Sequence, residues 1–285
     1  MTAFRTSARR RGINVFMTGL MWVAAAAATV PLVLILFNLL KEGITSLNWA
    51  FFTHLPAPPG QEGGGAANAI VGTILLVAGA SAFGLPIGIG AGIYLAENGK
   101  APLAVFVRFL ADVLNGLPSI VMGIFAWELI VVPMHHFSAL SGAFALGAMM
   151  IPTVTRTTEE MVRVVPSTLR EAALALGYTR WRTALRIVLP TAMAGIITGA
   201  LVALARIAGE TAPLLFTAFG NNFWSLSINK PVAALPLQIF NYATGPYDDW
   251  HQQAWAASLV LIALVLLISL LARFVTRSGF SRGVE

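Results

Sequence analysis

Two residues of opposite charge, Arg206 and Glu210, stand four positions apart in an otherwise apolar stretch. If this stretch is a helix, Arg206 lies about 24 Å beyond Pro190, well inside a bilayer. A charged side chain at that depth costs at least about 2.5 to 3.5 kcal/mol. Glu210 falls on the same helical face, but such a pair stabilises a helix by only about 0.2 to 0.5 kcal/mol. The pair therefore does not account for its own placement.

The chemistry of Arg206 suggests two roles. A guanidinium is a forked, permanently charged donor that matches the oxygens of a tetrahedral anion. Arg206 and Glu210 would then line a pathway for an anion. Alternatively, the two residues form a buried ion pair that holds this helix against a second membrane subunit. Both hypotheses stay open.

A second patterned segment covers residues 156–190, which are too charged to span a membrane. We expect two short helices here. Thr168 and Glu171 have the spacing of a capping box, and Gly177 stands where a helix would end. One apolar stripe at helical spacing comprises Leu169, Ala172, Ala173 and Leu176. A short helix with an exposed apolar face needs a groove on another protein to bury it.

The elements that carry these residues are membrane spans. Hydrophobic residues make up 57% of the chain and charged ones only 11%, against about 25% in soluble domains. Runs of about 20 apolar residues can cross the bilayer. We expect an all-α integral membrane protein with six transmembrane helices, within residues 17–40, 69–96, 117–133, 139–155, 191–219 and 254–272. The first run is too long for the apolar core of a signal peptide.

The placement of basic residues predicts the topology. With six spans, fifteen of the eighteen Lys and Arg residues fall on one side, whereas Lys41 and Lys230 fall on the other. The positive-inside rule then places both termini in the cytoplasm. The net charge of +6 thus reflects orientation in a membrane and not a nucleic-acid partner.

Glycine spacing predicts close helix packing. Gly84, Gly88 and Gly92 recur every four residues in the second span, and Gly195 and Gly199 do so in the fifth. Such stripes let helix backbones approach closely. A dinucleotide-binding reading fails because Gly92 comes one residue too early after Gly90.

Two segments on the outer side are not spans. Residues 43–68 are rich in Pro and Gly and indicate an irregular connector. Residues 221–250 carry aromatic side chains that suit either a partner-docking surface or plain anchoring at the membrane interface. Both interpretations of this segment stay open.

Several chemistries are excluded or disfavoured. The chain has no cysteine, so disulfides, thiolate catalysis and Cys-based metal sites are excluded. The motifs of intramembrane hydrolases are missing, and His135 with His136 follow a proline in an expected outer turn. No lysine completes a phosphate-cradling loop, so this chain does not hydrolyse ATP. We expect no catalytic residues and no metal or other cofactor in this chain.

The cytoplasmic segment also resembles a known family. Glu171, Ala172 and Ala173, then Gly177, then residues 187–190 (Ile-Val-Leu-Pro) match the EAA loop of ABC importer permeases. The resemblance implies a type I ABC importer permease fold whose cytoplasmic coupling helix seats in a cleft of an ATPase subunit. A passive channel would have no use for such a loop. The expected ATPase-coupling residues are Arg170, Glu171, Ala172, Ala173, Leu176 and Gly177.

A second resemblance concerns the charged pair. Residues 205–215 look like the fifth helix of PstA-type phosphate permeases, and Arg108, Asp112 and residues 116–121 resemble the start of the third. The likeness, over roughly residues 70–275, implies that inorganic phosphate passes Arg206, Glu210 and Thr211. Arg108 and Asp112 are expected to form an intrahelical pair near the cytoplasmic face. The alternative substrate is another anion, such as sulfate, molybdate or a phosphonate.

The family also implies partners. They are a second, related permease subunit (PstC-type), a cytoplasmic ATPase dimer (PstB-type) that binds ATP and Mg, and an extracytoplasmic phosphate-binding protein (PstS-type), all within membrane lipid. Transport would proceed by alternating access. The expected organisation is residues 1–68 (cytoplasmic N-terminus, first helix and outer loop), 69–275 (the transmembrane domain, with its coupling loop at about 156–190) and 276–285 (cytoplasmic tail).

Overall fold

The computed structural model describes residues 8–58, 60, 61 and 63–280. They form helices and connecting loops, with isolated bridges in place of strands. The long or structurally central helices are α1 (Ala8–Ser46), α3 (Ala67–Glu97), α4 (Pro102–Gly116), α5 (Ser119–Ala126), α7 (Ala139–Val164), α10 (Leu189–Ala208) and α13 (Asp248–Phe280). The shorter ones are α2 (Trp49–Thr53), α6 (Val132–Met134), α8 (Ser167–Ala175), α9 (Arg180–Thr183), α11 (Ala212–Leu215) and α12 (Leu235–Ala243). The π-helical turns η1 (Trp127–Val131) and η2 (Ala184–Val188) precede α6 and α10.

Helix α7 lies at the centre and is packed on two sides through glycine. A Cβ added at Gly88 would lie 2.8 Å from Val154 of α7, and one at Gly92 would lie 2.6 Å from a backbone oxygen of α7. On the other side, Gly199 of α10 lies against Thr157. In lipid, helices associate chiefly by such packing. The predicted role of both glycine stripes is confirmed.

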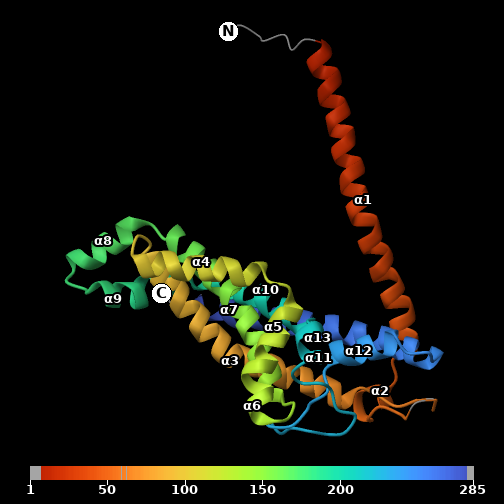
Figure 1. Ribbon diagram of the computed structural model, residues 1–285. Coiled ribbons are helices and arrows are strands. Elements are labelled where there is room, and N and C mark those ends of the chain that lie inside the picture. The colour runs from red at the N-terminus through yellow and green to blue at the C-terminus, as the bar shows by residue number, and fades with distance from the viewer. Residues whose placement is uncertain (1–7, 59, 62, 281–285) are drawn as a thin grey trace.

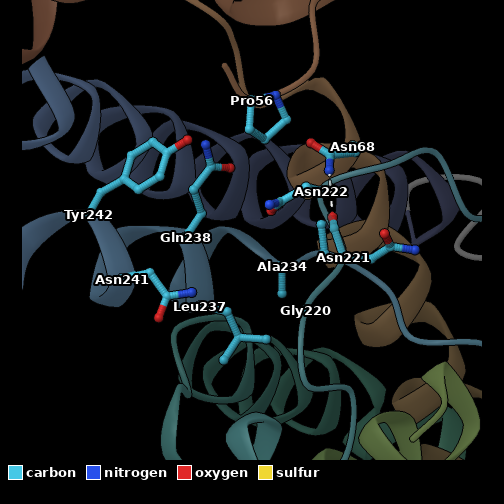
Figure 2. Close-up of a pocket in the computed structure, with 11 residues that line it drawn as sticks. Pro56, Asn68, Gly220, Asn221, Asn222, Ala234, Leu237, Gln238, Asn241 and Tyr242 are labelled. Atoms are coloured by element: carbon cyan, nitrogen blue, oxygen red, sulfur yellow. Dashed lines mark hydrogen bonds between the residues drawn. The ribbon is translucent and has the colours of Figure 1, made fainter. Parts of the chain in front are cut away.

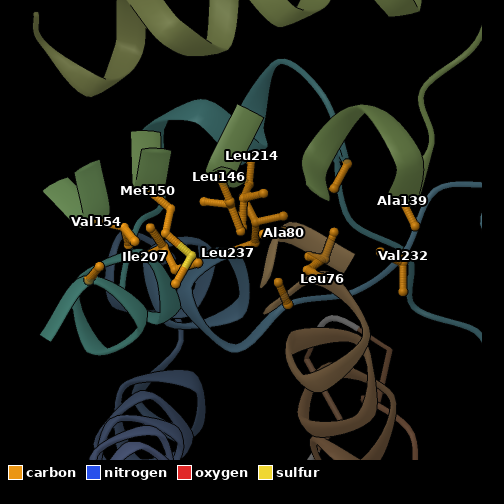
Figure 3. Close-up of a cluster of buried hydrophobic side chains, with 13 residues drawn as sticks. Leu76, Ala80, Ala139, Leu146, Met150, Val154, Ile207, Leu214, Val232 and Leu237 are labelled. Atoms are coloured by element: carbon orange, nitrogen blue, oxygen red, sulfur yellow. The ribbon is translucent and has the colours of Figure 1, made fainter. Parts of the chain in front are cut away.

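The main buried cluster joins five elements (Figure 3). Leu76 of α3 packs with Leu146 and Met150 of α7, Ile207 of α10 and Leu214 of α11. Each of these side chains is at most 2% exposed. The cluster therefore fixes the first halves of α3 and α7 and the end of α10 relative to one another.

Helix α1 stands away from the rest of the chain in Figure 1. Its end nearest the bundle contacts α13, where Gly43 lies against Leu259. Its most apolar stretch is not buried by any part of the described chain. The exposed apolar surface of α1 must therefore be covered by lipid or by another polypeptide.

The number of spans is only partly settled. Four described helices are long and apolar enough to cross a membrane, namely Arg10–Ser46, Ala67–Glu97, Arg180–Ala208 and Asp248–Leu270. The pair Pro102–Gly116 and Ser119–Met134 adds a fifth if it is one bent span. Helix α7 is less apolar because its second half is charged, so the six-span topology stays a prediction. The terminal residues 1–7 and 281–285 lie outside the described part, and the latter are half of the predicted cytoplasmic tail.

The bend between α4 and α5 was not predicted from the sequence. The two helices meet at 107°. Pro118 disfavours helical geometry at Leu117, whose backbone is extended. Pro118 is also the N-cap of α5. The predicted span at residues 117–133 is therefore only the second arm of this bent pair. The outer connector at residues 43–68 also contains a short helix, α2, capped by Asn48.

Candidate functional site

Helix α10 places Arg206 at the middle of the bundle. Gly195 lies against Met161 and Gly199 against Thr157, so α10 and α7 run antiparallel in a constant register. The same register sets Arg206 opposite about residue 150, near the midpoint of α7. The depth of Arg206 in the bilayer stays a prediction.

The pairing of Arg206 with Glu210 is loose. The distance from Nε of Arg206 to Oε1 of Glu210 is 3.8 Å, longer than a hydrogen bond. The Arg206 side chain is 48% exposed and that of Glu210 is 20% exposed. Among the described residues, the Arg206 side chain has no hydrogen bond. Its donors remain available to a ligand.

The helix that carries Arg206 ends two residues later, whereas the sequence predicted a single helix over residues 191–219. Helix α10 ends at Ala208, with Gly209 as its cap, and the short helix α11 follows. Glu210 keeps a turn-like bond from its N–H to the carbonyl of Ile207. Thr211 is half-buried, and its carbonyl accepts the N–H of Leu214. The break places Glu210, the partner of Arg206, and the adjacent Thr211 between α10 and α11.

This arrangement suits an anion that carries a proton. The guanidinium supplies several donors in a plane, and the carboxylate of Glu210 is an acceptor. Together they carry no net charge. A protonated oxyanion can donate to Glu210 and accept from Arg206, whereas a fully deprotonated one can only accept.

A ladder of polar side chains joins α4 to the second half of α7. Arg108 donates to Glu159 at 2.6 Å, and Arg156 donates to Asp112 at 2.6 and 2.7 Å. Thr153 donates to Asn115 at 3.1 Å. The predicted intrahelical pair of Arg108 with Asp112 is wrong, because each residue finds a partner on α7 instead.

Glu159 is the centre of this ladder. Its side chain is only 2% exposed and also contacts Arg156 at 3.1 Å and Arg163 at 2.7 Å. Sequence reasoning missed Glu159, since its main partner Arg108 is 51 positions away. Only the antiparallel pairing of α4 with α7 brings them together.

The predicted coupling segment contains one separate helix, α8, rather than two. Residues 156–164 continue α7, and α9 runs through η2 into α10 as one helix over Arg180–Ala208. Pro190 lacks an N–H, and the π-helical turn before it shifts the backbone bonds so that the helix continues. The predicted capping box is also wrong, because Pro166 is the N-cap and no side chain caps α8.

The end of α8 agrees with the prediction. Gly177 has φ +83°, its N–H bonds to the carbonyl of Leu174, and the N–H of Tyr178 bonds to that of Ala173. This pair of bonds is a Schellman motif, which favours glycine at the left-handed position. No atom lies within 4 Å of a Cβ added at Gly177, so backbone conformation and not space requires glycine.

The remaining predicted coupling residues face different ways. Leu176 is 79% exposed, and Glu171 and Ala172 are also exposed. Ala173 is 2% exposed and therefore cannot contact a partner. Arg170 is directed toward the ends of α3 and α7, where it bonds Glu97 and two carbonyls.

The end of the bundle where α3 begins holds a small pocket (Figure 2). Its walls carry neutral amides, among them Asn68 at the start of α3 and Gln238 of α12. Asn68 donates to the carbonyl of Asn221 at 2.7 Å. Burial raises the pKa of the Tyr242 phenol at its rim. The pocket contains none of the predicted site residues.

No group of three or more His, Cys, Asp and Glu side chains that could hold a metal ion occurs in the described part of the chain. The predicted pathway residues Arg206, Glu210 and Thr211 lie at and just beyond the end of α10, and the predicted coupling residues lie on and beside α8.

Comparison with known proteins places the chain among transport proteins. Residues 88–278 match the family described as binding-protein-dependent transport system inner membrane component. The chain is 48% identical to the phosphate transport system permease protein PstA of Yersinia pestis over 86% of its own length and 83% of the relative's. It is 44% identical to that of Haemophilus influenzae over 93% and 94% of the two chains.

Solved structures support the fold. An inward-facing MetNI methionine ABC transporter chain matches with a TM-score of 0.60 at 19% identity, covering 74% of this chain and 92% of that one. A chain of a bacterial ABC transporter that imports the acidic polysaccharide alginate matches with a TM-score of 0.64 at 13% identity, over 97% and 98%. The helices therefore have the arrangement of an ABC importer permease.

Proposed function

This chain belongs to the binding-protein-dependent transport system inner membrane components, among their PstA-type members, and from this we propose its function. It is the permease subunit of an ATP-driven importer that moves inorganic phosphate across the bacterial inner membrane. It is a multi-pass membrane protein and works as a non-catalytic subunit.

The observation that carries the site proposal is the position of Arg206. It lies opposite the midpoint of α7, is half-exposed, and makes only a 3.8 Å ion pair with Glu210. An arginine kept only for structure would be expected to bond its partner closely, because an unpaired charge in the membrane is costly. We assign Arg206 to binding phosphate as it passes through the bundle.

Glu210 supplies selectivity in this proposal. Phosphate near neutral pH keeps at least one proton, so it can donate a hydrogen bond to the Glu210 carboxylate while Arg206 binds its other oxygens. Sulfate has no proton to donate and would face an unpaired negative charge. Sites that hydrogen-bond a ligand hydroxyl discriminate strongly against ligands that lack it. Thr211 is placed to add a hydroxyl from the same broken segment.

Helix α8 supplies the connection to ATP hydrolysis. Its exposed residues Glu171, Ala172 and Leu176 form the face that docks on a PstB-type ATPase, and Gly177 sets the turn that ends this face. The same proposal includes a PstC-type second permease, because an ATPase dimer has two clefts and this chain has one α8. A PstS-type protein delivers phosphate from outside, and both termini are cytoplasmic.

The test is uptake by the complete transporter in proteoliposomes, with labelled phosphate and sulfate. We expect wild type to accumulate phosphate only and Arg206→Gln to lose uptake by at least about a hundredfold, as for loss of two charge-assisted hydrogen bonds. Glu210→Gln should retain assembly but discriminate less against sulfate. Arg186→Gln, an exposed arginine at the cytoplasmic side, is the matched control.

The outcomes separate the parts of the proposal. Normal phosphate uptake by Arg206→Gln would show that the residue is structural. Preference of wild type for sulfate would remove the substrate assignment. Glu171→Lys should leave phosphate binding intact yet abolish the link between ATP hydrolysis and uptake; unchanged coupling would remove the docking assignment.

A further inference from the structure

The side chain of Arg170 connects three helices at the cytoplasmic end of the bundle. Its Nη1 donates to the carbonyl of Val165 and its Nη2 to that of Val162, both at 2.8 Å. Its Nε lies 3.3 Å from Oε1 of Glu97, the last residue of α3. Arg170 itself belongs to α8, so one guanidinium joins α8 to the ends of α7 and α3.

This position does not fit a contact with the ATPase. The Arg170 side chain is 23% exposed and its donors are engaged on the membrane side of α8. The neighbouring Glu171 and Ala172 are exposed on the outer side. The sequence-based assignment of Arg170 to the docking face therefore conflicts with where its donors point.

We propose that Arg170 is the positioning residue through which α8 moves α3 together with α7 during the transport cycle. The proposal rests on the proposed function, because it takes α8 as the helix that the ATPase moves. Arg170 touches neither phosphate nor nucleotide in this role. It transmits the movement of α8 to α3.

The connectivity shows why α3 needs such a contact. Helix α7 is covalently joined to α8 through Val165 and Pro166 alone, so it follows α8 directly. Helix α3 has no covalent link to α8. Within the described ranges, Arg170 with Glu97 is the only hydrogen bond or ion pair between these two helices.

The chemistry of the contact requires arginine. The last carbonyls of α7 and the carboxylate at the end of α3 all carry negative or partial negative charge, as the C-terminal ends of helices do. A planar guanidinium can donate in three directions at once, whereas a lysine ammonium is a compact point charge on a flexible stem. Arg170→Lys is therefore expected to restore the charge but not the three-way connection.

The direct test measures whether α3 follows α8. The chain contains no cysteine, so Ser167→Cys on α8 and Lys100→Cys just beyond α3 allow two spin labels to be placed uniquely in this subunit. Electron–electron distances are measured in the complete transporter without nucleotide and with trapped ATP. We expect the distance to stay constant in the otherwise unaltered complex and to change on ATP binding in Arg170→Gln.

Two further variants keep this test decisive. Glu97→Gln removes the same ion pair from the α3 side and leaves α8 unaltered, so it replaces Arg170→Gln if that variant does not assemble. Arg182→Gln removes an exposed arginine of the same cytoplasmic segment and serves as the control. A distance that changes on ATP binding in the unaltered complex would overturn the proposal, as would Arg170→Gln and Glu97→Gln behaving like Arg182→Gln.

A functional readout accompanies the distances. The ratio of phosphate imported to ATP hydrolysed should fall about tenfold in Arg170→Gln and Glu97→Gln, as expected for the loss of one charge-assisted hydrogen bond. ATPase binding should be unchanged, because the docking face is intact. If wild type does not import phosphate, the proposed function fails, while the distance measurement still decides the role of Arg170.

Discussion

Removing the charge of Glu159 should destabilise the bundle, because this buried carboxylate pairs with three arginines. Glu159→Gln replaces one carboxylate oxygen by an NH₂ group that faces arginine donors. In the unaltered chain, the cluster has a net charge of +1, from the three arginines Arg108, Arg156 and Arg163 and the two carboxylates of Glu159 and Asp112. The substitution raises this net charge to two within a largely buried cluster.

The magnitude follows from burial. Breaking a buried ion pair by removing one partner costs about 3 to 5 kcal/mol. The arginine side chains are 22%, 32% and 51% exposed, so water recovers part of this loss. We expect the free energy of unfolding to fall by about 2 to 3 kcal/mol. Since this ladder joins α4 to α7, these two helices should separate first.

The assay is reversible unfolding of the purified protein in mixed micelles, with increasing sodium dodecyl sulfate and helical circular dichroism as the signal. The adjacent Glu160 offers a matched control, because it is exposed and has no hydrogen bond or ion pair among the described residues. Glu160→Gln should change the free energy of unfolding by less than about 0.5 kcal/mol. Equal, small changes in both variants would refute the reasoning that Glu159 holds α4 on α7.

Two further predictions concern the packing of α3. Gly92→Ala should lower the free energy of unfolding in the same assay by about 1 to 3 kcal/mol, because the added Cβ would lie 2.5 Å from Thr158 of α7. Gly90→Ala, with open space around the added Cβ, should not destabilise. The reverse order would contradict the close approach of α3 and α7. Thr73→Val should lower the free energy of unfolding by about 1 to 3 kcal/mol, because the buried N–H of Leu235 donates to the Thr73 hydroxyl at 2.8 Å. Thr73→Ser keeps the hydroxyl and should retain stability. If the valine variant is as stable as the serine variant, this bond does not hold α12 on α3.

The external pocket is best explained by the fold rather than by the transport site. Asn68 of α3 donates its amide NH₂ group to the carbonyl of Asn221, and Gln238 of α12 donates its own to the carbonyl of Gly65, in the loop before α3. Both side chains are less than a tenth exposed. The sequence marked this outer segment by its aromatic residues, and whether it docks a partner or anchors at the membrane interface stays a prediction.

Features that depend on neighbours along the chain were accessible from the sequence. The apolar runs predicted the long helices because crossing the bilayer requires about 20 apolar residues, whatever the helix packs against. The four-residue spacing of Gly84, Gly88 and Gly92 predicted a smooth face for the same local reason. Gly177 marked the end of α8 because a left-handed position after a helix favours glycine. Arg206 was predicted to be a site residue from its expected depth in the membrane.

Features that depend on which helices meet were decided by the tertiary structure. Arg108 could pair with Asp112 on its own helix or with Glu159, and only the antiparallel contact of α4 with α7 selects Glu159. The motif containing Arg170 predicts a docking helix but not which of its side chains face inward, since that is set by the ends of α3 and α7. Local spacing defines the faces of a helix, and the choice of neighbour for each face is a property of the whole packed bundle.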